Sequence, residues 1–382
     1  MSRPEKRDFF YGKMTVRDIQ NIMEEWAPEQ LASERDNVGL QTGKLNSKVK
    51  NILVALSLTE SIVKEAIRLK SDLIITHHPL IFQPLKKIDE TERVGKLISL
   101  LIKNNIALYS AHTNLDFTRD GVSFHLAHII GLESVDFLFK DKSLNKKIIV
   151  YVPPAYLEKV RNAMAEAGAG IIGNYETCSF ASKGTGSFKP VGLAKPFTGA
   201  VGKLSMVDEI RLEMTVPAWN LANVIKAMRA AHPYEEVAYD VYSLESQSDK
   251  YGAGVIGTLL KPVDAEKFLE HVRRSLKIPL LRINHRYPRK IFKVACCGGS
   301  GGDLLPHAIN QNADAFITGD LSFHRFEETN GKLLLIDGGH YETEYPIINV
   351  IVKHLRDKIK QRKVLIKVAR SGTNNNFIKY II

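Results

Sequence analysis

The sequence predicts an α/β protein in which a parallel-sheet domain is split into two halves by an inserted α+β domain. Short apolar runs alternate with helical patterns near both ends of the chain, and they come in the same order at each end. A repeated strand-helix pattern lies between them. We therefore expect the first half at residues 1–145, the insertion at 146–248 and the second half at 249–382.

The predicted strands of the first half are three short apolar runs: NILVALSL from Asn51, DLIITHHPL from Asp72 and IALYSAHT from Ile106. The amphipathic patterns SIVKEAIRLK and VGKLISLLIK separate these runs and predict helices. Because strands that alternate with helices are joined by crossover connections, we expect the three strands to pair in parallel.

The second half repeats this order with the runs FKVACCGG, DAFITGD and KLLLIDGGH. The helical pattern LLPHAINQNA and the segment FHRFEETNG separate these runs. Residues 72–76 read DLIIT and residues 314–318 read DAFIT, and polar residues follow both. We therefore expect the outer segments to form one α/β domain, with one sheet whose carboxyl edge gathers the residues that follow each strand.

The inserted segment contains an internal repeat with an offset of 64 residues. The residues that recur at this offset are Val152, Pro153, Leu157, Val160, Ala163, Met164 and Ala167. Each copy consists of a strand, IIVYVP or RLEMTVP, followed by a helix with apolar residues at helical spacing. With a closing strand such as EVAYDVYSL, two copies give a ferredoxin-like arrangement. The Gly-rich link at 184–202 is expected to form a long loop or a hairpin.

The composition of the 382 residues is that of a globular protein and argues against several classes of function. The chain has no apolar run of about 18 residues and no apolar segment at its start, so we expect a cytoplasmic protein without membrane contact. The formal net charge of +11 would suit a nucleic acid or another anionic partner. Lys and Arg are scattered, however, apart from the stretch KIKQRKVLIK. A solvated basic surface is the preferred interpretation, and a nucleic-acid partner is not expected.

Two cysteines and a glycine-rich loop follow the first predicted strand of the second half. Cys296 and Cys297 are adjacent, without metal-ligand spacing, and three cysteines in the chain are too few for a disulfide framework. We interpret them as small buried residues. The loop from Gly298 to Gly302 could hold a phosphate with its backbone N–H groups or form a tight turn, and both alternatives stay open.

Histidines and carboxylates follow the predicted strands of both halves. The candidate metal ligands are His77, His78, His112, Asp116, His340 and Glu344. His112 and Asp116 are four residues apart, as are His340 and Glu344, so a helix at each position would place both groups on one face. Neighbouring side chains at a strand end point apart, so His77 and His78 suit two ions better than one. Each pair alone is more often structural, but their shared position at strand ends predicts one site.

Imidazole and carboxylate ligands suit zinc, iron or manganese, whereas an all-oxygen shell would suit magnesium or calcium. We expect two divalent ions per chain to share these ligands, with Glu344 able to bridge them and positions left for water or substrate. Asp320 and His324, in the segment GDLSFH, could orient the ligands or move protons. A structural supporting role is the alternative for both.

Several motifs, in order along nearly the whole chain, together resemble a known family. They are DNVGLQTG from Asp36, THHPLIF from Thr76, SAHTNLD from Ser110, GGSGGDLLPHA from Gly298, TGDLSFH from Thr318 and DGGHYETE from Asp337. This set resembles the Nif-three-like family of dinuclear-metal proteins, whose members are commonly named GTP cyclohydrolase 1 type 2 homologues. The inserted segment, with HPYEEVAYDVY from His232, resembles the CutA-like or PII-like domain of the longer members.

The resemblance implies a set of metal ligands and an assembly. The ligands it implies are His77, His78, Asp116, His340 and Glu344, with Glu344 as the bridge. It implies that His112 is a ligand or a close neighbour, and that the protein forms a toroidal homohexamer with the metal sites facing an internal cavity. One position departs from the family, because Ser57 in ALSLTE stands where an Asp is frequent. Any supporting task of that carboxylate is therefore in doubt in this chain.

Two functions are compatible with these residues. The first is a metal-dependent hydrolase, similar to GTP cyclohydrolase type 2 homologues, in which a bridging hydroxide attacks a small molecule such as a nucleotide. The alternative is a metal-storage, metal-delivery or regulatory protein without turnover, whose inserted domain senses a small molecule. Catalytic residues are not assigned, and the candidates are His112, Asp320 and His324.

Overall fold

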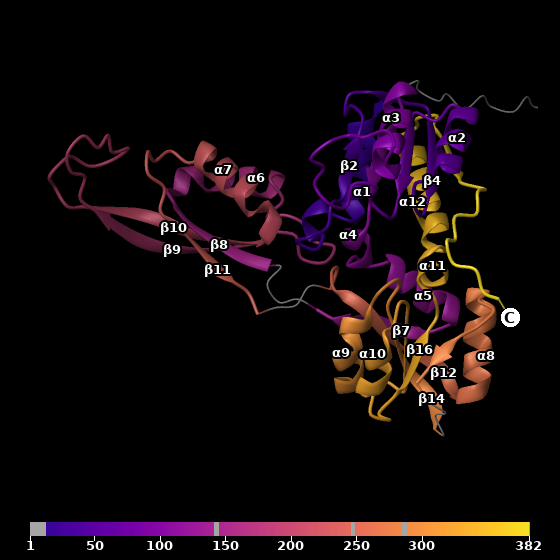
Figure 1. Cartoon of the computed structure of the whole chain (residues 1–382). Helices are drawn as coiled ribbons and strands as arrows, with labels where there is room; N and C mark the ends of the chain where they lie inside the picture. The colour runs from indigo at the N-terminus through magenta and orange to yellow at the C-terminus, as the bar shows by residue number, and fades with distance from the viewer. Residues whose placement is uncertain (1–12, 141–144, 246–248, 285–288, 382) are drawn as a thin grey trace, which may run out of the picture. The chain divides into compact units, whose positions relative to one another are not determined.

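The chain divides into two compact units (Figure 1). The computed structural model describes residues 13–140, 145–245, 249–284 and 289–381. The larger unit consists of Met1–Phe139 and Lys250–Ile382, and the inserted unit is Lys140–Asp249. Within the described ranges, no helix has both the length and the apolar character needed to cross a lipid bilayer.

One sheet of the larger unit contains five described strands in the order β17-β4-β5-β6-β2. Their bounds are β2 (Gly39–Thr42), β4 (Asn51–Ala55), β5 (Leu73–Thr76), β6 (Ala107–Ser110) and β17 (Lys367–Arg370). Strands β17, β4, β5 and β6 pair in parallel, and β2 pairs antiparallel with β6 at one edge. The three strands predicted in the first half and their parallel pairing are confirmed.

Helices cover both faces of this first sheet, which explains why its strands are apolar throughout. They are α2 (Glu60–Arg68) and α3 (Arg93–Lys103) on one face, and α1 (Val16–Trp26) and α12 (Ile347–Gln361) on the other. Successive residues of β4 pack into the hydrophobic cores on opposite faces of the sheet, because side chains alternate along a strand. Leu53 and Ala55 pack with α2 and α3, whereas Ile52 and Val54 pack with α1 and α12.

The second sheet of the larger unit has six described strands in the order β13-β16-β15-β14-β12-β7. Their bounds are β7 (Glu133–Phe139), β12 (Ala253–Asp264), β13 (Arg282–Ile283), β14 (Lys290–Cys296), β15 (Ala315–Thr318) and β16 (Leu334–Asp337). The three predicted strands, β14, β15 and β16, pair in parallel, and the others pair antiparallel. The covering helices are α5 (Val122–Ile130) and α8 (Ala265–Leu276) on one face, and α9 (Leu305–Asn310) and α10 (Phe323–Glu328) on the other.

The prediction of one sheet shared by the two halves is wrong, because the larger unit contains these two separate sheets besides a short pair, β1 (Met14–Thr15) and β3 (Lys48–Val49). The halves also exchange elements. Strand β7 comes from the first half and joins the second sheet, whereas α12 and β17 come from the second half and complete the first sheet (Figure 1). An apolar run shows that a strand is buried but not which strand lies beside it, so the sequence pattern was compatible with either arrangement.

The inserted unit is an antiparallel sheet in the order β11-β8-β10-β9, with two helices packed on one face. Its elements are β8 (Asn145–Val152), α6 (Leu157–Glu166), β9 (Ser179–Phe188), β10 (Ser205–Pro217), α7 (Leu221–Ala231) and β11 (Tyr239–Ser243). This order is that of a split βαβ, or ferredoxin-like, unit. The repeat is visible as two strand-turn-helix copies, with 3-10 turns at Pro154–Tyr156 and Ala218–Asn220. The Gly-rich link belongs to a hairpin, because β9 pairs with β10 on either side of residues 189–204.

The chain leaves and re-enters the larger unit at neighbouring points, because Phe139 in β7 is the pairing partner of Ala253 in β12. Partners in an antiparallel pair are about 5 Å apart, which a linker of a few residues spans. Replacement of residues 141–248 by a short Gly-Ser linker should therefore leave the larger unit folded. The segment Lys140–Asp249 should fold alone, because it has its own core. Thermal melting followed by circular dichroism checks both fragments, and a linker variant without a cooperative transition would contradict the expectation.

Candidate metal centre

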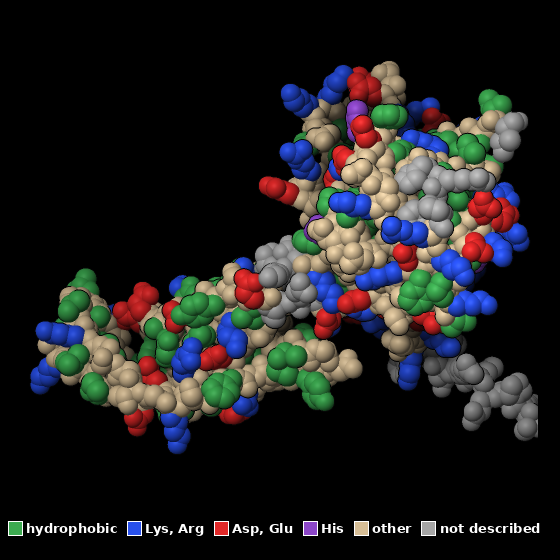
Figure 2. Space-filling model, turned by 90° about the horizontal axis from the view of Figure 1, so that it is seen from below, with side chains coloured by type: hydrophobic (Ala, Val, Ile, Leu, Met, Phe, Trp, Pro, Cys, Tyr) green, Lys and Arg blue, Asp and Glu red, His purple; other side chains and the backbone are tan. Residues whose placement is uncertain are grey.

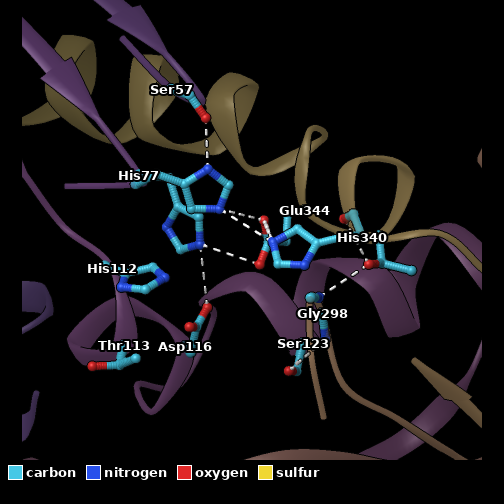
Figure 3. Close-up of polar contacts among 12 residues, drawn as sticks. Ser57, His77, His112, Thr113, Asp116, Ser123, Gly298, His340 and Glu344 are labelled. Atoms are coloured by element: carbon cyan, nitrogen blue, oxygen red, sulfur yellow. Dashed lines mark hydrogen bonds and ion pairs between the residues drawn. The ribbon is translucent and has the colours of Figure 1, made fainter. Parts of the chain in front are cut away.

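Residues that follow parallel strands of both sheets form one cluster of histidines and carboxylates (Figure 3). His77 and His78 follow β5, and His112 comes shortly after β6, in the first sheet. Helix α11 (His340–Glu344) comes shortly after β16 in the second sheet. Ligands commonly bind at the carboxyl edge of parallel strands, and here two sheets contribute to one site.

Backbone bonds extend β5 past its end and hold its two histidines in place. The N–H group of His77 donates to Ala55 at 3.3 Å, and that of His78 donates to Leu56 at 2.9 Å. Consecutive side chains on an extended backbone point apart. The side chain of His77 is accordingly fully buried, whereas that of His78 is 24% exposed.

The buried carboxylate of Glu344 lies at the centre of the cluster. Its Oε2 atom is 2.8 Å from Nε2 of His78 and 3.0 Å from Nε2 of His340. Its Oε1 atom is 3.7 Å from Nε2 of His77. Figure 3 shows the carboxylate between the imidazoles of the first sheet and His340. The four-residue spacing within α11 brings His340 and Glu344 together, so one carboxylate contacts imidazoles from both sheets.

A second carboxylate, Asp116, reaches the cluster from the short helix α4 (Thr113–Asp116). Its Oδ1 atom is 3.6 Å from Nε2 of His77. The ring of His112 lies 5.2 Å from that of His77 and 5.5 Å from that of His78, measured between centroids. The donor atoms of His77, His78 and His112 all lie within 4.8 Å of one another. The same holds for the donor atoms of His78, His340 and Glu344. The structure thus brings together all six residues expected as ligands.

Each of the four imidazoles has a polar contact at its Nδ1 atom, on the side of the ring opposite the centre of the cluster. The partners are the carbonyl oxygen of Ala111 for His77 at 2.8 Å, Ser57 Oγ for His78 at 2.6 Å, Asp36 for His112 at 3.0 Å and Asp320 for His340 at 2.6 Å. Such contacts orient the rings of metal-binding histidines, and they leave Nε2 directed into the cluster. The sequence analysis assigned no role to Asp36, although it opens the motif DNVGLQTG.

Asp36 can orient the ring of His112 because hydrogen bonds from Thr113 fix its carboxylate. It accepts hydrogen bonds from the backbone N–H and the hydroxyl of Thr113 at 3.1 and 2.5 Å. Burial alone would raise the pKa of Asp36, but the bonds from His112 and Thr113 outweigh burial and lower it to about 2. Asp36 is therefore ionised at neutral pH and acts as an acceptor.

Burial and charge act against each other on the ionisable groups of the cluster. Burial alone would lower the pKa of His77, but the carboxylates of Asp116 and Glu344 raise it to about 9. For His340, burial is outweighed by the carboxylates of Glu344 and Asp320, which raise its pKa to about 9. Burial dominates for His78 and lowers its pKa. Burial raises the pKa of Asp116, while the surrounding imidazoles overcome burial and hold that of Glu344 well below its usual range. A metal ion would replace the protons that these imidazoles otherwise hold beside the carboxylates.

Two buried polar atoms of the cluster have no hydrogen-bond partner among the described residues, His77 Nε2 and Asp116 Oδ1. Leaving such an atom unpaired costs about 1 to 3 kcal/mol. The two atoms are 3.6 Å apart, too far for a good hydrogen bond between them. Converging nitrogen and carboxylate donors of this kind fit a divalent ion such as zinc, iron or manganese. The residues present therefore match the requirements of a metal centre.

The glycine-rich loop after β14 packs against this cluster. A Cβ atom at Gly299 would overlap Oε1 of Glu344, so only glycine leaves the carboxylate its space. The N–H groups of Gly298, Gly299 and Gly301 donate to hydroxyls of neighbouring Ser and Thr side chains. Of the two alternatives for this loop, the structure favours the tight turn, because these donors already have partners and do not form an anion cradle.

Of the other two candidate residues, Asp320 contacts the cluster and His324 does not. Asp320 Oδ2 contacts Nδ1 of His340, so Asp320 supports a cluster ring from outside. The ring of His324 is 80% exposed and lies beside Glu327 on the same helix. In the described part of the chain, no contact joins His324 to the cluster, because its helix directs the ring to solvent.

The adjacent cysteines behave as small packing residues. Cys296 is fully buried in the core of the second sheet. Burial, together with the negative charges of Asp116 and Glu344, raises the pKa of Cys297 to about 12. The Cys297 thiol therefore stays protonated at neutral pH, which does not suit a nucleophile.

Comparison with known proteins identifies the family. The family model Duf34/NIF3 (NGG1p interacting factor 3) matches residues 14–376. The chain belongs to this family. A relative in Bacillus subtilis, named GTP cyclohydrolase 1 type 2 homolog, is 40% identical over 364 residues, which cover 94% of this chain and 97% of the relative. A relative of the same name in Halalkalibacterium halodurans is 36% identical over 365 residues, which cover 95% and 98%. The resemblance of the motifs to the Nif-three-like family is confirmed.

Solved structures of Duf34/NIF3 relatives have a similar fold. The Bacillus cereus protein related to NIF3 has a TM-score of 0.79 and 39% sequence identity, over 96% of this chain and 99% of that protein. Staphylococcus aureus protein SA1388 has a TM-score of 0.77 and 28% identity, over 96% and 99%. The mixed α/β fold with several sheets is therefore shared with these proteins.

Gly299→Ala should disturb the centre, whereas Gly331→Ala should not. The two glycines have φ angles of +63° and +70°, so both alanines incur a similar backbone strain, about 1 kcal/mol. Only at Gly299 would the new Cβ overlap Glu344, because nothing lies within 4 Å of a Cβ at Gly331. We expect the zinc content of reconstituted protein, measured by plasma mass spectrometry, to drop in Gly299→Ala alone. Parental content in both variants would show that the loop does not shape the site.

Proposed function

We propose that this chain holds two divalent metal ions and acts as a metal-dependent hydrolase. The observation that carries the proposal is the pair of donor groups that overlap at His78. The assignment is His77, His112 and Asp116 for one ion, His78 and His340 for the other, and Glu344 as the carboxylate between them. Zinc, iron and manganese match this mixture of imidazole and carboxylate donors.

The exposure of the cluster supports a role in catalysis. Two ions of this kind lower the pKa of a bound water and polarise the bond that the water attacks. His77 is fully buried, but the side chains of His78 and His340 are 24% and 28% exposed, so a substrate can approach from their side. Asp320, which is half exposed, accepts from Nδ1 of His340 and keeps the proton of that ring away from the cluster.

GTP is the first substrate to test, because relatives carry the name GTP cyclohydrolase 1 type 2 homolog. Opening the imidazole ring of guanine is a hydrolysis, which suits a centre that activates water. Since a fold does not determine a substrate, the panel should also contain small cyclic amides.

Glu344→Gln should remove both the metal and the turnover, because a neutral amide cannot replace a carboxylate shared by two ions. Elemental analysis should give two ions for each parental chain and fewer than one for this variant. Glu342→Gln is the matched control, since Glu342 lies on the same helix but bonds to Asn376. Conversion of GTP, measured by liquid chromatography, should vary with the metal content of the parent, Glu344→Gln and Glu342→Gln.

Two outcomes would change this proposal. Retention of two ions by Glu344→Gln would show that the carboxylate is not shared. A parent that binds two ions but converts no member of the panel would favour a role without turnover.

Metal storage, metal delivery or regulation is the second candidate function, and a cavity in the inserted unit favours it. We propose that this unit is CutA-like or PII-like and binds a small molecule. The cavity has a volume of about 690 Å³, within the range of about 300 to 1,000 Å³ typical of small-molecule sites. Its lining includes the aromatic side chains of Tyr151, Phe188, Phe197 and Tyr234. Aromatic walls of this kind suit a ligand with a planar ring.

Strand β9 contributes several small residues to the lining of this cavity. Residues 182–188 of β9 line the cavity, and Ser182, Gly184 and Gly186 are the small residues at every second position of this stretch. Glycine weakens a strand, and within strands it frequently marks a site where a ligand approaches the backbone closely. A Cβ at Gly184 would meet nothing within 4 Å, so no neighbouring side chain requires glycine there.

Gly184→Leu should therefore fill the cavity without disturbing the metal centre. We expect GTP to raise the melting temperature of the parent after the metal has been removed by chelation, and this rise to be lost in Gly184→Leu. Ala181→Leu, on the same strand but outside the cavity lining, should keep the rise. An equal rise in all three proteins would place the ligand elsewhere, and no rise in the parent would count against nucleotide sensing.

We further propose a cytoplasmic homohexamer with toroidal shape. Large apolar side chains are exposed on the inserted unit, and Figure 2 shows such side chains at its surface. Among them, Val191, Leu193, Leu204 and Met206 are at least 68% exposed. Contiguous exposed apolar patches mark surfaces that bind another protein, and these side chains are the proposed contacts between subunits.

A further inference from the structure

A second group of polar side chains, separate from the metal centre, lies on the face of the first sheet that α1 covers. Gln20 and Glu24 belong to α1, Glu29 begins a 3-10 turn that follows this helix, and Tyr109 belongs to β6. The amide nitrogen Nε2 of Gln20 donates to Oε1 of Glu24 at 2.8 Å and to Oε1 of Glu29 at 3.0 Å. One neutral amide thus holds two carboxylates together.

The two carboxylates lack the opposite charge that such a pair usually has. In the described part of the chain, neither Glu24 nor Glu29 lies within ion-pair distance of a Lys, Arg or His side chain. Glu25, the next residue of α1, contacts Lys358 and Arg362 at 3.0 and 2.8 Å. Burial and the neighbouring Glu24 raise the pKa of Glu29 above its usual value. Two like charges at this separation repel each other unless a cation or a proton lies between them.

Two oxygen atoms beside this acidic pair are buried and have no hydrogen-bond partner among the described residues. They are Oε1 of Gln20 and the hydroxyl of Tyr109. Tyr109 is 1% exposed. Burial and then the charges of Glu29 and Glu24 raise the pKa of Tyr109 well above its usual range, which places the hydroxyl beside the pair. Buried polar atoms in native proteins are nearly always paired, with protein groups, water or an ion.

Packed elements hold these oxygen atoms in place. The apolar face of α1 and the ring of Tyr109 belong to the same hydrophobic core. The four-residue spacing puts Gln20 and Glu24 on one face of the helix. Gly39, in β2, has a φ angle of +87°, and a Cβ atom there would lie 2.6 Å from Oε1 of Glu29. The glycine therefore leaves this carboxylate its space, as Gly299 does for a carboxylate of the metal centre.

We propose a further cation site in the larger unit, which binds calcium or magnesium through oxygen atoms of Gln20, Glu24, Glu29 and Tyr109. Oxygen donors suit these hard cations, whereas the imidazoles of the metal centre suit zinc, iron or manganese. A half-turn of the Gln20 amide exchanges Nε2 for Oε1 and directs that oxygen at the ion. The ion then neutralises both carboxylates and pairs both orphaned oxygens, and water completes its shell. This site is independent of the proposed two-ion centre.

Calcium binding to the full chain tests the proposal. The protein is first loaded with zinc and freed of excess zinc, and is then dialysed to equilibrium against radioactive calcium. We expect one calcium ion per chain, with half-saturation at or below about 1 mM, the range of weak calcium sites. Glu24→Gln and Glu29→Gln should each weaken binding at least about tenfold, because the charge of the ligands sets calcium affinity. Tyr109→Phe should weaken it less, because the phenol is a neutral donor.

Glu25→Gln is the matched control, since it removes a carboxylate from the same helix that pairs with Lys358 and Arg362. It should bind calcium as the parent does. Competition by magnesium in the same dialysis decides between the two ions, and either result supports the site. Equal calcium binding in the parent, Glu24→Gln and Glu29→Gln would place the calcium elsewhere and overturn the proposal. A parent that binds no calcium and no magnesium would show that the carboxylates share a proton instead, which also overturns it.

A second measurement needs no variant and so does not depend on how well the variants fold. A crystal structure of the parent grown with calcium chloride should show an ion about 2.3 to 2.6 Å from oxygens of both Glu24 and Glu29. A water molecule at that position, or direct contact between the two carboxyl groups, would overturn the proposal.

Discussion

The arrangement of the larger unit depends on a buried carboxylate, Glu344, that contacts imidazoles from two sheets. A charge can be buried in this way only where opposite charges and hydrogen bonds replace the lost water. His77 and His78 provide this compensation from the first sheet, and His340 provides it from the helix that carries Glu344. The two sheets must therefore pack together for the charge to be tolerated, which couples the site to the fold.

Glycines and fixed imidazoles make this close contact possible. Gly299 leaves space for the carboxylate of Glu344, and a Cβ at Gly319 would crowd the backbone of His340. Contacts to the Nδ1 atoms direct the Nε2 atoms toward the cluster, so that four imidazoles meet at one site. The glycine-rich loop is thus explained by its contact with Glu344.

Features that depend on residues close together in the sequence could be predicted, and features that depend on distant residues could not. The apolar runs predicted β4, β5 and β6, and the four-residue spacing predicted that His340 and Glu344 share a face of α11. The division into two sheets depends on which strands pair, and the apolar pattern does not contain this information. Asp36 is 76 residues from His112, and no local pattern signals that contact. His324 follows a strand, as the candidate ligands do, but its own helix directs the ring to solvent.

The most direct measurement is a crystal structure of the metal-loaded protein with anomalous data collected at the absorption edge of the metal. We expect two peaks about 3.5 to 4 Å apart, one beside His77 and one beside His340, with an oxygen of Glu344 facing each. A single peak, or two peaks that Glu344 does not contact, would contradict the shared carboxylate.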